Sequence, residues 1–237
     1  KDPRTGADTA DLIWVPAHDR LRGPNVLATA TSPHRVSAAR LAAARAEPDP
    51  RLAALPSPRV GVLAGGDSRH HRFGADDIAR LVGDLRRLAS SGASLMITAS
   101  RRTPAPLRDA LVEMTERYGG FFWNGDGENP YVAILALADA LVVTADSTNM
   151  VGEAAATGRP VLVFEPGGGH PKITAFLESL RRDGVVKPFD GRLERFSYTP
   201  LDSTPIIAAA IAERLAARRL RAPSPAPAPE RDAGTTA

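Results

Sequence analysis

From residue 59 onward, short apolar segments alternate with longer segments of helical pattern, and this alternation narrows the possible folds more than any other feature. The apolar segments, which predict strands, are residues 59–65, 94–100, 121–124, 140–145 and 160–164. The segments that predict helices lie near residues 75–90, 105–118, 130–138, 148–157 and 171–182. Because the strands are apolar on both faces and separated by helices, they indicate a parallel sheet covered on both sides. The predicted fold class is therefore α/β, with a Rossmann-like, doubly wound parallel sheet.

The rest of the chain is less regular. Residues 11–15 and 25–29 predict two short strands, and a helix near 37–47 follows them. The next segment, EPDPRLAALPSP, is rich in proline, which is excluded from helix interiors and central strands, so we expect an interdomain linker or a crossover here, with the linker at residues 51–58.

The two ends of the chain carry further expectations. A last helix is predicted near 205–219, and the division into domains counts residues 206–220 as this C-terminal helix. The Pro/Ala-rich tail at 221–237 is expected to be disordered. The chain starts at Lys1 without an initiator Met and enters a strand within a few residues, so we expect it to be cut from a longer protein.

Composition excludes several classes of function. The longest apolar run, AILALADALVVTA, is too short for a bilayer and is interrupted by Asp139. The net charge is +3, but the basic residues are nearly all arginines scattered among acids, so nucleic-acid binding is not expected. The chain has no cysteine, so it has no disulfide and no thiolate metal site, which suits a reducing cytoplasm.

The loops that follow the predicted strands are the places where a ligand would lie, because open parallel sheets bind ligands beyond the carboxyl ends of their strands. In the first loop, AGGDSRHHRFG, Gly65 and Gly66 allow the backbone to adopt positive φ and to approach a ligand closely, while Ser68 adds a donor for an anion. The second loop, ASRRTP, carries Ser100 and two arginines, the first of them Arg101, which suit a phosphate. Ordinary turn and capping roles remain an open alternative for every one of these residues.

The third loop lies in the stretch TADSTNMVGEAAATGRP, and a fourth, EPGGGHPK, follows the strand at 160–164. If a helix begins near Thr148, its first N–H groups and the positive end of its dipole form an anion site beside Asp146 and Ser147. The same residues would equally serve as ordinary helix caps.

Glu153 extends this candidate site by one turn of the helix. Asn149 and Glu153 are four residues apart and therefore share one helix face, so Glu153 could accept hydrogen bonds from a ribose while phosphates lie at the helix start. Such a ligand would be a nucleotide diphosphate. The alternative, equally open, is that Glu153 is a solvated carboxylate.

Two other chemistries are not expected. No His, Asp and Glu residues have the spacing of a metal site, and the loop after the strand at 59–65 lacks the G-x-G-x-x-G of dinucleotide enzymes. No tyrosine is followed four residues later by lysine, as a short-chain reductase or epimerase requires. We therefore predict neither a metal nor a cofactor. Separately, we expect His18 and Asp19 to lie in a surface turn.

Several motifs, in order, carry a resemblance to a known family. They are RGPNV (22–26), AGGDSRHHRF (64–73), TASRRTP (98–104), NPY (129–131), VVTADSTNMVGEAAATGRPV (142–161) and FLESLRRDGVVKPFDGRLERFSYTPL (176–201). Over residues 1 to 219 the chain resembles bacterial members of the mitochondrial fission protein family named for elongated mitochondria. Members of that family look like GT-B glycosyltransferases, in which two Rossmann-like domains face each other over a cleft.

The resemblance implies a division into domains and a set of donor-binding residues. Residues 1–50 would be the end of the first domain, 51–58 the linker, and 59–205 the second domain, which binds a sugar nucleotide. The implied donor-side residues are Gly65, Gly66, Ser68, Ser100, Arg101, Asp146, Ser147, Asn149, Met150 and Glu153. The general base usually comes from the first domain of such enzymes, so no catalytic residue is assigned.

The expected function is that of a metal-independent glycosyltransferase of GT-B type. It would move a sugar from a nucleotide diphosphate sugar to an unidentified glycan or lipid acceptor, in the cytoplasm or at the inner face of the membrane, where peripheral contact is compatible with the sequence. The alternative, from a different class, is a non-catalytic interaction or scaffold protein of the fission family. An epimerase of nucleoside-diphosphate sugars is a weaker alternative, because the dinucleotide motifs are missing.

Overall fold

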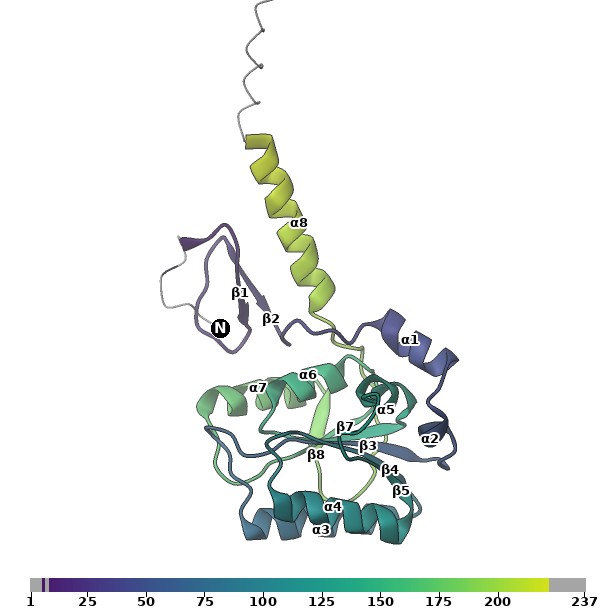
Figure 1. Ribbon diagram of the computed structural model, residues 1–237. Coiled ribbons are helices and arrows are strands. Elements are labelled where there is room, and N and C mark those ends of the chain that lie inside the picture. The colour runs from purple at the N-terminus through teal and green to yellow at the C-terminus, as the bar shows by residue number, and fades with distance from the viewer. Residues whose placement is uncertain (1–5, 7–8, 222–237) are drawn as a thin grey trace, which may run out of the picture.

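The computed structural model describes residue 6 and residues 9–221 (Figure 1). Its centre is a parallel sheet of six strands in the order β5-β4-β3-β6-β7-β8. The strands are β3 (Arg59–Ala64), β4 (Ser94–Ala99), β5 (Gly120–Trp123), β6 (Ala140–Thr144), β7 (Val161–Phe164) and β8 (Val186–Pro188). Counted from β3, this is the strand order 3-2-1-4-5-6 of Rossmann folds. The predicted α/β class is confirmed.

Helices cover both faces of this sheet, as Figure 1 shows. Helices α3 (Ala75–Ser90) and α4 (Ala105–Tyr118) cover one face, and α5 (Tyr131–Leu137), α6 (Thr148–Ala155) and α7 (Pro171–Arg182) cover the other. Successive strand residues point to opposite faces, so Val142 lies in the core on the side of α3 and α4, and Val143 in the core on the side of α6 and α7. The two-sided apolar pattern in the sequence reflects these two cores.

The part of the chain before β3 forms a separate small sheet. Strands β1 (Ile13–Pro16) and β2 (Val26–Thr29) pair in parallel, and helix α1 (Ala38–Ala46) then packs on α5. The proline-rich segment contains the short helix α2 (Pro50–Ala53), which was not predicted. Pro50 occupies its first turn, where proline is tolerated, and Asp49 accepts a hydrogen bond from the Arg51 N–H there. Strand β8 was likewise not predicted.

Helix α8 (Thr204–Arg221) leads away from the six-strand sheet and passes the small sheet (Figure 1). The Arg214 guanidinium donates to the Pro24 carbonyl at 3.0 Å, which joins the helix to the loop between β1 and β2. The predicted terminal helix is confirmed, and it includes Arg221; residues 222–237 of the predicted tail lie outside the described residues. Across the described part of the chain, no helix combines the length and the apolarity needed to span a membrane.

Candidate functional site

The four loops singled out in the sequence meet at the carboxyl edge of the sheet, where β3 lies between β4 and β6 and the strand order reverses. The Asp67 N–H donates to the Arg102 carbonyl at 3.1 Å, which joins the first loop to the second. The Gly65 N–H donates to the Thr144 hydroxyl at 2.8 Å, which joins the first loop to the end of β6. His71 and Gly168 form an isolated antiparallel bridge between the first and fourth loops. Ligands of open α/β sheets bind at such a reversal point.

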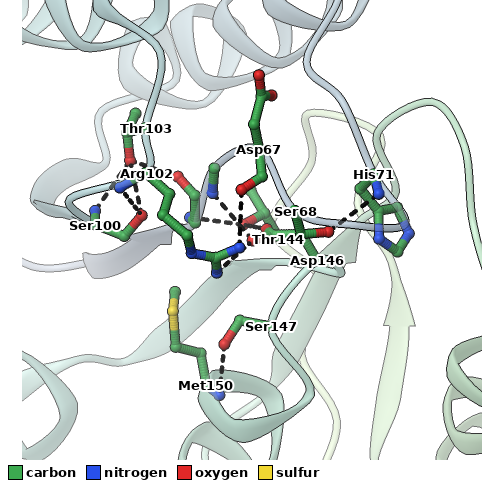
Figure 2. A network of polar contacts seen from close by, with 12 residues as sticks. Asp67, Ser68, His71, Ser100, Arg102, Thr103, Thr144, Asp146, Ser147 and Met150 are labelled. Carbon is green, nitrogen blue, oxygen red and sulfur yellow. Dashed lines mark hydrogen bonds and ion pairs between the residues drawn. The ribbon is translucent and has the colours of Figure 1, made fainter.

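Asp146 is the centre of this loop network (Figure 2). Its side chain is fully buried, and its carboxylate accepts hydrogen bonds from the Gly66 N–H at 3.0 Å and from the Thr144 hydroxyl at 2.7 Å. An Arg102 Nη2 atom lies 3.2 Å from the same carboxylate. Asp146 therefore holds the loops together and does not present its carboxylate to the outside of the edge.

Gly65 and Gly66 are glycines because of this close packing. Neither of them uses the positive φ that glycine allows, whereas Gly168 and Gly169 in the fourth loop do. A Cβ atom on Gly65 would lie 2.1 Å from an Asp146 carboxylate oxygen, and one on Gly66 would lie 2.0 Å from the Arg102 carbonyl oxygen. No larger side chain fits at either position without moving the loops.

In the second loop the inward-facing arginine is Arg102, which the site prediction left out. Its guanidinium donates to the Asp67 carbonyl at 2.9 Å and to the Asp146 carboxylate, while its side chain stays 48% exposed. Arg101 is exposed, and within the described residues its guanidinium has no hydrogen-bond or ion-pair partner. The hydroxyl of Ser100 accepts from the Arg102 N–H at 3.1 Å and so shapes the turn. Nothing in the pair of adjacent arginines indicates which one turns inward.

Ser68 also has a structural role in its loop. Its hydroxyl accepts hydrogen bonds from the N–H groups of His70 at 3.2 Å and His71 at 3.0 Å. His71 is buried beside it, and its Nδ1 has no partner among the described residues. The imidazoles of His70 and His170 lie 4.3 Å apart, centroid to centroid, at an open pocket of about 680 Å³.

The start of α6 is the part of the edge that matches the prediction in detail. The helix begins at Thr148, as expected, and the Ser147 hydroxyl caps it by accepting from the Met150 N–H at 3.4 Å. Asn149 is exposed, and Met150 is half-buried against the core. The positive end of the helix dipole therefore points out of the sheet edge, next to the loops described above.

Glu153 has a partner that the sequence reasoning did not foresee. Its carboxylate accepts a hydrogen bond from the Tyr131 hydroxyl at 2.5 Å. Burial raises the pKa of Tyr131, and the charge of Glu153 raises it further, so the phenol stays protonated and remains a donor. In the sequence this tyrosine is marked by the motif NPY, because Tyr131 opens α5 directly after Asn129 and Pro130. One carboxylate oxygen of Glu153 is thus engaged in joining α5 to α6.

His18 and Asp19 lie in the turn after β1, as expected, but this turn is packed against α7 and Asp19 is not at the surface. Asp19 is buried and forms an ion pair with Lys172 in the first turn of α7. The His18 ring packs edge-on against Phe176 of the same helix, and burial lowers the pKa of His18. The loop after β1 is therefore attached to α7. Throughout the described residues, no group of three or more His, Asp or Glu side chains is arranged to hold a metal ion.

Comparison with known proteins gives a consistent family relationship. The family model described as Mitochondrial fission ELM1 matches residues 1–215. The mitochondrial fission protein ELM1 of Arabidopsis thaliana is 38% identical over 243 residues, covering 91% of this chain and 57% of that protein. An uncharacterized protein of Rickettsia prowazekii, RP120, is 31% identical over 158 residues, covering 63% of this chain and 44% of that protein. The chain thus spans about half the length of the curated relatives it matches.

Solved structures are more distant. The ADP-heptose LPS heptosyltransferase II of E. coli is 17% identical with a TM-score of 0.40, and the match covers 85% of this chain and 56% of that one. A likeness of this degree carries no argument about what this chain binds or does. The sequence matches, in contrast, establish the family: this chain belongs to the mitochondrial fission ELM1 family.

Proposed function

We propose that the carboxyl edge of the six-strand sheet binds the diphosphate of a nucleotide sugar, and that the protein is a glycosyltransferase of GT-B type. The observation that carries the proposal is the capped start of α6 at the point where the strand order reverses. A helix start offers N–H donors and a positive potential to an anion, and Arg101 is exposed in the neighbouring loop. Both features suit a diphosphate.

The reaction under this proposal is attack of an acceptor hydroxyl on the anomeric carbon of the donor sugar. The new bond joins the acceptor oxygen to that carbon, the bond from the carbon to the diphosphate oxygen breaks, and the hydroxyl proton passes to a general base that no residue here is assigned to supply. The start of α6 and Arg101 would stabilise the negative charge that develops on the departing diphosphate, a task that needs no metal ion. The acceptor would be a glycan or a lipid.

The residues proposed for donor binding fall into two groups. Asp146, Gly65, Gly66, Ser68 and Ser100 would act indirectly, by holding the loops. The groups left to face a ligand are Arg101, Asn149 and the first N–H groups of α6, with Ser147 and Met150 in the same turn. Glu153 would reach a ribose with the oxygen that does not serve Tyr131.

The domain division is also a proposal. Residues 59–205 would form the donor domain and residues 1–50 the end of an acceptor-side domain, joined by the linker at 51–58. The separate pairing of β1 with β2, outside the six-strand sheet, supports this division.

The competing function is that of a non-catalytic interaction protein. The name of the Arabidopsis relative, a mitochondrial fission protein, favours it. Asp146 and one carboxylate oxygen of Glu153 form their contacts with other residues of the chain, which also favours this function. Polar groups that stabilise the fold are accounted for without a ligand. An epimerase acting on nucleoside-diphosphate sugars has less support, as the dinucleotide motif is missing.

A titration separates these functions. The protein is heated with UDP, GDP and ADP sugars in turn. A ligand that binds only the folded state adds about 2.7 kcal/mol to the unfolding free energy at a hundredfold excess over its dissociation constant, and this raises the melting temperature. We expect one sugar nucleotide to do so, and the variant Arg101→Gln with Asn149→Ala to lose the shift. Arg182→Gln, at the far end of α7, is the control.

Two results would overturn the proposal. One is that no sugar nucleotide raises the melting temperature at millimolar concentration. The other is that the double variant keeps the full shift. Binding without release of nucleoside diphosphate in the presence of glycan and lipid acceptors would favour the interaction protein over the enzyme.

A further inference from the structure

A second pocket lies at the opposite edge of the sheet from the four loops. It has a volume of about 450 Å³, within the usual range of small-molecule sites. Pro58 directly precedes β3, Ala140 opens β6 and Pro160 directly precedes β7, and all three residues line the pocket. Because β3, β6 and β7 are neighbours in the sheet, the pocket sits at the amino ends of its central strands. It is therefore separate from the proposed donor site.

The wall of this pocket is built from the segment after β8, and that segment is fixed in place. Glu194 forms an ion pair with Lys187 at 2.6 Å, and the Lys187 ammonium lies 5.0 Å from the centre of the Phe196 ring. The Tyr198 hydroxyl donates to the Arg159 carbonyl at 2.8 Å, which ties the same segment to the turn before β7. These contacts fix the position of the segment that forms one wall of the pocket.

The charges that line the pocket favour an anion. Arg159 and Arg195 are exposed, and neither guanidinium has a hydrogen-bond or ion-pair partner within the part of the chain that the structure describes. Of the two carboxylates in the lining, Glu194 is paired with Lys187, and Asp139 accepts a hydrogen bond from the Arg59 N–H at 2.8 Å and keeps its negative charge. Together with Lys187, the region around the pocket holds three cationic groups and two carboxylates. Two cationic groups are thus left to interact with a ligand.

The floor is apolar. Pro58, Pro160 and Leu193 are half-buried and line the same pocket as the two arginines. A bare inorganic anion would leave these surfaces in water, whereas an anion with an apolar body would cover them, at a gain of about 25 cal/mol for each Å² buried.

We propose that this pocket binds a small organic acid. Its carboxylate meets the guanidiniums of Arg159 and Arg195, which present planar pairs of donors that match carboxylate geometry, and its apolar body lies against Pro58, Pro160 and Leu193. The proposal does not depend on the donor site, because the two sites lie on opposite edges of the sheet and share no residue.

Benzoate is the probe that tests the proposal, with acetate and benzamide as matched controls. Titration of the isotopically labelled full chain, followed by NMR, is expected to shift the amide signals of Ala140 and Leu193 with a dissociation constant on the order of 1 mM. Acetate, which lacks the ring, is expected to bind roughly tenfold more weakly, and benzamide, which has the ring without the charge, to leave these signals in place. Equal shifts with benzoate and benzamide would overturn the proposal.

Variants give an independent measurement. Arg159→Gln combined with Arg195→Gln is expected to abolish the benzoate shifts, whereas Arg192→Gln, an exposed arginine three residues from Arg195 and outside the pocket, is expected to keep them. Unchanged affinity in the double variant would overturn the proposal, as would benzoate shifts centred on Arg101 at the other edge. If the double variant fails to fold, the comparison of benzoate with benzamide on the unchanged protein still decides the question.

Discussion

At the scale of single residues, replacement of Asp146 is expected to lower the stability of the protein more than any other change in the candidate site. Replacing it with Ala would leave the buried Gly66 N–H and Thr144 hydroxyl without their acceptor, so we expect a loss of about 3 kcal/mol of unfolding free energy. Arg102→Ala removes a half-exposed charge and is expected to cost about 1 kcal/mol. Urea denaturation measures both values. Equal losses in the two variants would mean that the ion pair, and not the buried carboxylate, dominates.

Single residues also show which parts of the site the sequence predicts and which it does not. The place of the site could be predicted, because βα loops of a parallel sheet share one edge and helix starts favour residues such as Ser147. The direction of each polar side chain could not. Arg101 and Arg102 are adjacent and chemically identical, and only the packed loops make Arg102 the partner of Asp146.

At the scale of elements, the cap of α6 offers a direct comparison with another helix. Ser147→Ala removes the hydroxyl that accepts from Met150 and is expected to lower the unfolding free energy by about 1 kcal/mol, and Ser147→Asp to restore most of it. Ser37→Ala, at the cap of α1, is the matched control, because Ser37 accepts from the Arg40 N–H in the same way at 3.2 Å. Thermal denaturation measures all three variants. A loss in Ser147→Ala well above that in Ser37→Ala would show a role beyond capping.

Elements also differ in how well their pattern predicts them. Long helices and two-sided apolar strands such as β6 were predicted because burial on both faces leaves a clear signal. The helix α2 and the strand β8 were missed for a physical reason: each is too short to show a period, and α2 begins at a proline. For α2 the local signals are present, a proline in its first turn and the Asp49 cap, whereas β8 forms by pairing with β7.

At the scale of the whole molecule, the ion pair between Asp19 and Lys172 attaches the loop after β1 to α7. Lys172→Met removes the charge that faces the buried Asp19 carboxylate, so we expect amide hydrogen exchange in β1 and β2 to speed up roughly tenfold or more, while β3 and β6 keep their protection. Lys187→Met, in a pair whose two side chains are each 42% exposed, is the control and is expected to leave β1 and β2 unchanged. Faster exchange throughout the six-strand sheet would contradict a local attachment.

The whole molecule also determines what binding at its carboxyl edge would involve. Gly66, Thr144 and Arg102 come from three segments of the chain and share one carboxylate, so the loops that carry them become ordered when the chain folds. The entropy lost in fixing those loops is a cost of folding and not of binding. A ligand that arrives at this edge meets a backbone that is already ordered, so the entropy that the protein loses on binding would come mainly from exposed side chains such as Arg101, and calorimetry would register it.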